Sequence, residues 1–112
     1  MTDRESSVRP PSERVAFVTG ASRGIGRAIA VALARAGHPI GFSYASDADA
    51  ARETQHAVEA EGAKAIAVQS DVSDPAAVDA AFGEVEAAFG KVTILVNNAG
   101  ITRDGLVARM SD

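Results

Sequence analysis

A glycine-rich loop directly after a short apolar segment is the feature that most constrains the fold of this chain. The apolar segment covers residues 15–18, the loop contains Gly20, Gly24 and Gly26, and helical periodicity begins at once over residues 25–36. Glycines let a backbone turn tightly out of a strand and approach a bound group closely, and the amides of a helix N-terminus attract negative charge. A strand, loop and helix in this arrangement predict a site for the pyrophosphate of a dinucleotide. Glycines that serve only as turns and helix caps are the alternative reading.

Short apolar segments alternate with longer amphipathic ones along the rest of the chain. Strands are predicted at residues 15–18, 39–44, 65–68 and 92–96, and helices at residues 25–36, 48–61 and 75–89. Right-handed crossovers between parallel strands then give an α/β fold, a Rossmann-like doubly wound parallel sheet of spatial order 3-2-1-4, with helices on both faces. A complete sheet of this kind has two such halves, and 112 residues hold about one. We therefore expect a disordered tail over residues 1–12, and over residues 13–112 the N-terminal part of a dinucleotide-binding domain, truncated before the second half.

The composition excludes several classes of function. A net charge of -4 gives no broad basic surface for nucleic acid. No apolar run approaches the length of a membrane span, and a chain without cysteine has no disulfide or thiolate chemistry, which fits a cytoplasmic location. His38 and His56 have no Cys, Asp or Glu cluster around them at metal-ligand spacing. We therefore predict no nucleic acid, no membrane and no metal.

Two motifs carry a resemblance to a known family. Residues 19–26 read Thr-Gly-Ala-Ser-Arg-Gly-Ile-Gly and residues 97–100 read Asn-Asn-Ala-Gly. Together they closely resemble the two cofactor motifs of the short-chain dehydrogenase/reductase family, whose glycine spacing departs from the general Gly-x-Gly-x-x-Gly fingerprint. Within that family, residues 100–104 and 110–112 are most similar to bacterial 3-oxoacyl-[acyl-carrier-protein] reductases. The resemblance covers residues 14–112 and implies hydride transfer from a nicotinamide cofactor to a ketone.

The resemblance also implies a set of cofactor contacts. They are Gly20, Gly24, Ile25 and Gly26 around the pyrophosphate, Asp71 and Val72 near the adenine, and Asn98, Ala99 and Gly100 beside the nicotinamide ribose. Simpler readings stay open for some of these positions. Asp71 is also suited to cap its own turn, and Asn97 and Asn98 are also suited to form the turn at the end of a strand.

The end of the second predicted strand indicates which nicotinamide cofactor is preferred. An acidic side chain there would bind a ribose 2'-hydroxyl and repel a 2'-phosphate. Tyr44 holds that position, no Asp or Glu occurs over residues 41–46, and Arg23 stands in the loop where the family has its phosphate-binding cation. NADP(H) is therefore predicted over NAD(H), with Ser22 and Ser46 as further hydroxyl donors. The alternative for Arg23 is a solvated surface charge.

No catalytic residue can be assigned in this chain. Reduction of a ketone needs a general acid and groups that hold the carbonyl, and the family supplies them from a Tyr-x-x-x-Lys pair, a Ser and an Asn. The one tyrosine, Tyr44, has no Lys four residues after it. We therefore expect the cofactor-binding fragment of an NADPH-dependent ketone reductase, inactive alone, whose parent reduces a 3-oxoacyl thioester. The alternative is a non-catalytic nucleotide-binding or interaction module.

The last predicted strand raises the question of partners. Residues 92–96 are apolar almost throughout, and without later strands their backbone would form an unpaired sheet edge. The isolated fragment should therefore be marginally stable, and we expect a complementing C-terminal chain or a homo-oligomer. In the full-length parent the substrate would be a small-molecule or acyl-carrier-bound ketone.

Overall fold

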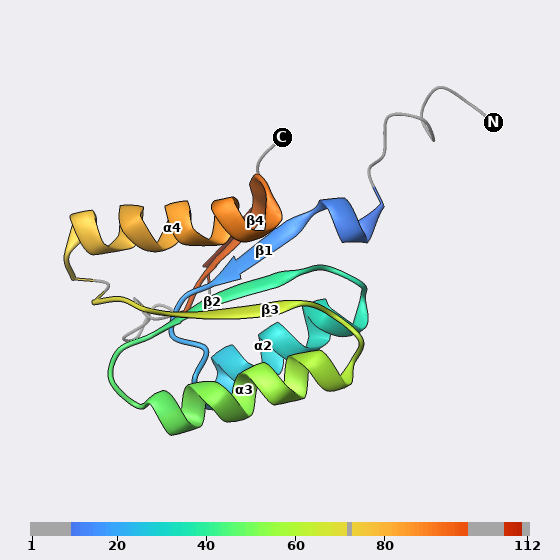
Figure 1. Ribbon diagram of the computed structural model, residues 1–112, viewed down its shortest axis with the longest axis horizontal. Helices are drawn as coiled ribbons and strands as arrows, with labels where there is room; N and C mark the ends of the chain where they lie inside the picture. The colour runs from blue at the N-terminus through green and yellow to red at the C-terminus, as the bar shows by residue number, and fades with distance from the viewer. Residues whose placement is uncertain (1–9, 72, 99–106, 111–112) are drawn as a thin grey trace.

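The computed structural model describes residues 10–71, 73–98 and 107–110. Within these residues, five strands form one sheet in the order β3-β2-β1-β4-β5 (Figure 1). The strands are β1 (Val15–Val18), β2 (Ile40–Tyr44), β3 (Ala65–Gln69), β4 (Val92–Asn97) and β5 (Val107–Met110), and the helices are η1 (Pro11–Glu13), α2 (Gly24–Arg35), α3 (Ala48–Ala60) and α4 (Pro75–Phe89). The first nine residues of the predicted tail lie outside the described residues, and its last two belong to η1, a single turn of 3-10 helix.

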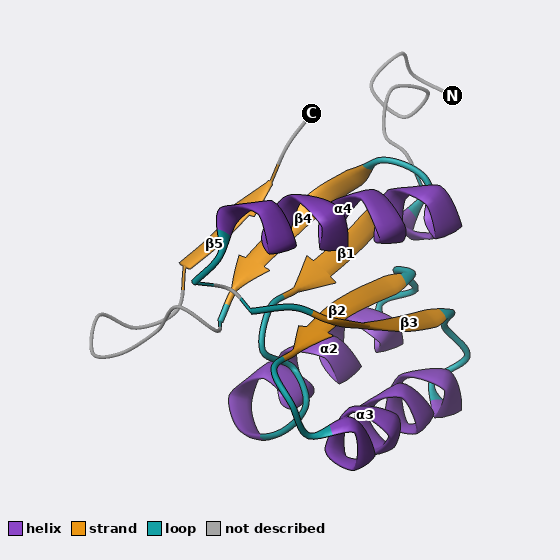
Figure 2. Ribbon diagram, turned by 60° about the vertical axis from the view of Figure 1, so that its left-hand side comes forward, coloured by secondary structure: helices purple, strands orange, loops and turns teal. Residues whose placement is uncertain are grey.

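The parallel order 3-2-1-4 predicted from the sequence is confirmed. Strand β1 pairs in parallel with β2 and with β4, and β2 pairs in parallel with β3. Parallel neighbours need crossovers, which the helices provide: α2 and α3 lie on one face of the sheet and α4 lies on the other (Figure 2). The carboxyl ends of β1 to β4 therefore meet at one edge of the sheet, which is the edge where open sheets of this class bind ligands.

Capping residues explain where two of the helices begin. Asp47 and Asp74 each accept a hydrogen bond of 3.0 Å from a first-turn backbone amide, at the starts of α3 and α4. A proline at the first position of α4, Pro75, needs no amide partner there. The predicted bounds of α4 are confirmed, and α3 ends one residue earlier than predicted.

Two apolar clusters form the core, one on each face of the sheet. Successive side chains of a strand point to opposite faces, so Ala16 and Val18 of β1 pack toward α2 and α3, whereas Val15 and Phe17 pack toward α4. All four are almost completely buried. A central parallel strand is covered on both faces, and this explains why residues 15–18 are continuously apolar.

Gly41 lets α4 pack closely against β2. A Cβ at this position would lie 2.5 and 2.6 Å from the two Cγ atoms of Val85 and 3.1 Å from its Cβ. Val85 is completely buried, and its branched side chain has one strongly preferred rotamer in a helix. The missing side chain of Gly41 therefore sets the distance between the sheet and α4.

The structure corrects the prediction that β4 forms the edge of the sheet. Strand β5 pairs antiparallel with β4, with Leu95 opposite Arg109 and Asn97 opposite Val107. This ladder supplies partners to backbone groups of β4 that an edge strand would leave exposed. Residues 107–110 include Arg109 and lie in a largely polar stretch of the sequence, so no apolar segment revealed β5. The β4 edge is therefore paired in this arrangement, and the alternative of a non-catalytic interaction module stays a prediction.

We expect Gly41→Ala to lower the free energy of unfolding by about 1 to 3 kcal/mol, because its methyl group would overpack against Val85. Val85→Ala alone should cost about 2 kcal/mol through lost burial. Because the smaller side chain makes room for the methyl, the double variant should lose clearly less than the sum of the single losses. Urea unfolding followed by circular dichroism measures all three. Additive losses would show that the two positions do not limit each other.

Candidate functional site

The glycine loop joins β1 to α2 at the carboxyl edge of the sheet. Gly20 and Gly24 have φ angles of 66° and 63°, in the region that residues with a Cβ rarely adopt. At Gly26 the backbone approaches so closely that a Cβ would lie 2.4 Å from the Gly20 carbonyl oxygen and 2.6 Å from Nδ2 of Asn98. The first two glycines therefore turn the chain, and the third brings α2 against the end of β1.

The N-terminus of α2 differs from those of α3 and α4. Arg23 holds its N-cap position in an extended conformation and makes no side-chain hydrogen bond to the first turn. The first amides of a helix lack intrahelical partners and carry partial positive charge. Gly24 leaves this end open, because a Cβ there would meet no atom within 4 Å. The loop therefore presents a helix N-terminus that can accept an anion.

Ser43 and Asn98 fix the loop to the neighbouring strands. The hydroxyl of Ser43 accepts the Gly20 amide at 3.1 Å, and its carbonyl oxygen accepts the Ala21 amide at 3.0 Å. From the other side, Nδ2 of Asn98 donates to the Gly20 carbonyl oxygen at 3.0 Å. Asn98 therefore braces the loop in addition to ending its strand. Ser43 was not among the predicted site residues, because a serine inside an apolar strand carries no signal of a contact to another loop.

A second brace comes from Arg27 on α2 and Thr54 on α3. The guanidinium of Arg27 donates to the carbonyl oxygens of Ser22 and Ala50, at 2.5 and 3.0 Å. Its Nε donates at 2.8 Å to Oγ1 of Thr54, whose hydroxyl donates in turn to the Ala21 carbonyl oxygen at 2.8 Å. Thr54 is completely buried. The loop, α2 and α3 are thus joined by one hydrogen-bond network, which the sequence analysis missed.

Arg23 forms an ion pair with Asp47, the residue immediately before α3. The two side chains are 69% and 43% exposed, so solvent reaches the pair. The Ala50 amide and then the Arg23 guanidinium hold the pKa of Asp47 below its usual value, so the carboxylate is charged near neutral pH. Asp47 was missed as a site residue because it lies one position beyond residues 41–46, the stretch searched for an acidic side chain. Its place directly before a predicted helix was the signal that marks it as a cap.

Asp71 closes the turn that follows β3. Its Oδ1 accepts the backbone amide of Ser73 at 2.9 Å and the hydroxyl of Ser73 at 2.6 Å. These hydrogen bonds stabilise the carboxylate and lower the pKa of Asp71. The geometry matches the alternative reading of a turn-capping carboxylate, and a contact with adenine stays a prediction.

The other predicted residues follow the same edge of the sheet. Tyr44 ends β2 and is partly buried, and Ser46 lies exposed between β2 and α3. Ile25, in the first turn of α2, is 68% exposed, an unusual position for a large apolar side chain. Three predicted contacts lie outside the described residues: Val72, Ala99 and Gly100.

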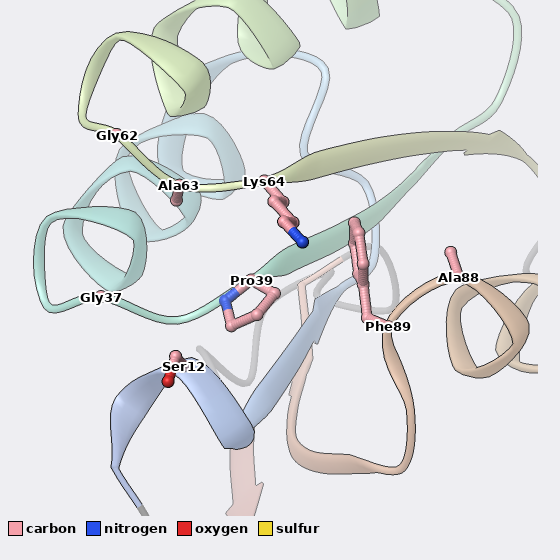
Figure 3. A pocket seen from close by; sticks show the side chains of 8 residues that line it. All are labelled: Ser12, Gly37, Pro39, Gly62, Ala63, Lys64, Ala88 and Phe89. Carbon is pink, nitrogen blue, oxygen red and sulfur yellow. The ribbon is translucent and has the colours of Figure 1, made fainter.

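Among the residues that the structure describes, hollows lie at two opposite edges of the sheet. The one beside the glycine loop has a volume of about 450 Å³ and is lined by Arg23, Arg27, Asp47, Asp49, Ala50 and Glu53. The other, of about 280 Å³, lies at the amino edge, where the side chains of Pro39, Lys64 and Phe89 point into it (Figure 3). Only the first adjoins the open helix end. The candidate site is therefore the glycine loop together with this charged hollow.

Over residues 10–71, 73–98 and 107–110, no three His, Cys, Asp or Glu side chains come close enough together to hold a metal ion. None of the helices in that part of the chain has the length and apolar character needed to cross a bilayer. His38 is buried, and its Nδ1 lies 2.8 Å from the Arg14 carbonyl oxygen, at the edge opposite the loop.

Comparison with known proteins gives consistent matches. Residues 14–112 match the family model described as short chain dehydrogenase. The chain is 45% identical over 97 residues to the 3-oxoacyl-[acyl-carrier-protein] reductase of Staphylococcus aureus. This match covers 87% of this chain and 39% of that protein. The chain thus spans about two fifths of the length of the curated relatives that it matches.

Solved structures with the same architecture include two bacterial enzymes. A short chain dehydrogenase from Burkholderia cenocepacia in complex with NADP is 46% identical with a TM-score of 0.77, over 87% of this chain and 40% of that one. A short-chain dehydrogenase/reductase from Serratia marcescens is 44% identical with a TM-score of 0.78, over 83% of this chain and 38% of that one. Both matches confirm the Rossmann-like arrangement of the strands and helices.

Thr54→Val should lower the free energy of unfolding by about 1 to 3 kcal/mol, because the partly buried Nε of Arg27 and the buried carbonyl oxygen of Ala21 lose a partner while the volume is kept. Thr54→Ser, which retains the hydroxyl, should keep most of the stability. Chemical unfolding of the three proteins gives the comparison. Equal stability of the valine variant and the parent would show that the network contributes nothing.

Proposed function

Because the chain belongs to the short chain dehydrogenase family, we propose that it forms the NADP-binding part of a ketone reductase. One observation carries the proposal: the N-terminus of α2 has no side-chain cap and opens onto free space within a loop of three glycines. A helix end in this state favours the pyrophosphate of a dinucleotide. When bound, the nicotinamide ring of the cofactor would supply the hydride.

The proposed cofactor contacts follow the carboxyl edge of the sheet. The pyrophosphate is assigned to Gly20, Gly24, Ile25 and Gly26, the adenine to Asp71 and Val72, and the nicotinamide ribose to Asn98, Ala99 and Gly100. The close approach at Gly26 supports this assignment, because it leaves the loop no room for side chains between α2 and β1. The hydrogen bond from Asn98 to Gly20 supports it further, since it holds the loop in place before any ligand arrives.

We assign the preference for NADP over NAD to Arg23. Its side chain is 69% exposed and lines the hollow, so the guanidinium can make a bidentate hydrogen bond to a 2'-phosphate there. Tyr44, Ser22 and Ser46 complete the proposed phosphate side of the site. The NADP complex of the Burkholderia cenocepacia relative is in agreement with this choice.

The reaction that we propose for the parent protein is reduction of a 3-oxoacyl thioester to the 3-hydroxyacyl thioester. A hydride goes from the cofactor to the carbonyl carbon, and a proton goes from a general acid to the carbonyl oxygen. The names of the curated relatives support this substrate. We place the general acid and the substrate contacts outside these 112 residues, either in a complementing C-terminal chain or in a longer, homo-oligomeric parent. A cytoplasmic location belongs to the same proposal.

Arg23→Ala should weaken NADPH binding about tenfold, because one charged hydrogen-bonding partner of the phosphate is lost. NADH, which has no 2'-phosphate, should bind almost as before. Fluorescence titration of both reduced cofactors gives the two dissociation constants. Arg52→Ala is the matched control: it removes an arginine that pairs with Asp49 on α3 and does not line the hollow. Tighter binding of NADH than of NADPH by the unaltered chain would overturn the preference for NADP.

Catalysis is tested by adding the part of a relative that this chain does not match. We expect the 112-residue chain, mixed with the separately expressed C-terminal part of the Staphylococcus aureus relative, to oxidise NADPH when a 3-oxoacyl thioester is supplied. Neither part alone should do so, since cofactor site and general acid would be on different chains. Absorbance of NADPH follows the reaction. Binding of NADPH without turnover in the mixture would contradict the proposed reaction and leave the cofactor assignment standing.

A further inference from the structure

We propose that Asp47 is a specificity-determining residue that competes with the 2'-phosphate of NADP for Arg23. This inference rests on the proposed function, since it concerns the choice between NADP and NAD at the same site. Asp47 thereby makes the preference for NADP over NAD smaller than Arg23 alone would make it. It acts by occupying the guanidinium and by adding negative charge where the phosphate would bind.

The first ground is the geometry of the pair. Oδ2 of Asp47 contacts Nη2 of Arg23, while Oδ1 accepts the Ala50 amide at 3.0 Å. The second bond anchors the carboxylate to the first turn of α3, so it cannot move away from the loop without uncapping that helix. A phosphate that binds Arg23 must therefore break the ion pair or share the guanidinium with a fixed carboxylate.

The second ground is the charge of the hollow. Its lining brings two guanidinium groups against three carboxylates, from Asp47, Asp49 and Glu53. Arg27 lies 3.5 Å from Glu53, and its donors already bind the carbonyl oxygens of Ser22 and Ala50. The guanidinium of Arg27 is thus already hydrogen-bonded within the brace. Arg23 is therefore the cation of this hollow that a 2'-phosphate would bind. Like charges close to an incoming phosphate weaken its binding.

The third ground is the difference between the two cofactors. A ribose 2'-hydroxyl is neutral and can donate a hydrogen bond to a carboxylate that follows the second strand. A 2'-phosphate is an anion, so the same carboxylate repels it. Asp47 lies three residues after Tyr44, the last residue of β2. Asp47 can therefore weaken the binding of NADPH and strengthen the binding of NADH. Its effect on the ratio of the two dissociation constants is then larger than its effect on either constant alone.

Asp47→Asn tests the inference, because the asparagine keeps the cap and removes the charge. We expect the dissociation constant of NADPH to fall about three- to tenfold at low salt, as one exposed charge next to a phosphate allows, and that of NADH to stay the same or rise. The change should shrink at high salt, where exposed charges are screened. Both constants come from fluorescence titration of the 112-residue chain.

Asp49→Asn is the matched control. It removes a carboxylate from the same hollow, one that pairs with Arg52 and not with Arg23, and should shift the NADPH constant much less than Asp47→Asn. A second control repeats Asp47→Asn in the Arg23→Ala background, where the gain should shrink because the competition for the guanidinium is gone and only the repulsion between carboxylate and phosphate remains. If the asparagine variant does not fold, Asp47→Ser supplies a neutral cap with the same expected outcome.

The outcomes separate this inference from the proposed function. An unchanged ratio of NADPH to NADH binding in Asp47→Asn would overturn the role of Asp47, and a gain of the same size without Arg23 would overturn its competition for the guanidinium. In either case a chain that still binds both cofactors leaves the proposed function intact. Failure of the unaltered chain to bind either cofactor would overturn the proposed function and the inference with it.

Discussion

Because Gly26 has no side chain, α2 can make the close contact on which the geometry of the candidate site depends. With no Cβ there, the first turn of α2 lies against the Gly20 carbonyl oxygen and Asn98, which follow the ends of β1 and β4. This approach brings a helix N-terminus to the seam between two central strands, and the remaining contacts of the loop only preserve it. A larger residue would push α2 outward and separate the loop from the strand that follows α4.

Much of the fold could be predicted, because local signals and packing agree. The uninterrupted apolar run of β1 follows from burial on both faces, and Asp74 with Pro75 marks the start of α4 through capping. Strand β5 could not be predicted, because its pairing depends on the free edge of β4 and not on any property of its own four residues. The packing role of Gly41 could not be predicted either, since a glycine in a strand does not indicate which helix packs against it.

The site divides in the same way. The glycines and Asn98 were predictable because their spacing belongs to one connected loop and to the end of one strand. Pairs that meet across two elements were not, and Asp47 with Arg23 is the clearest case, since 24 positions separate them. At Asp71 the turn-capping alternative is seen in the structure, where its carboxylate accepts from Ser73, and the contact with adenine stays a prediction.

The hydrogen bonds of Thr54 have an evolutionary meaning as well as a structural one. One buried hydroxyl accepts from the Arg27 guanidinium and donates to the carbonyl oxygen of Ala21, so its loss removes a hydrogen-bond partner from both. A lineage that loses the hydroxyl would gain stability from a compensating change at the arginine, or from another side chain that supplies both an acceptor and a donor at this place. Positions 27 and 54 should therefore change together among descendants of this sequence, as a linked pair that joins α2 to α3.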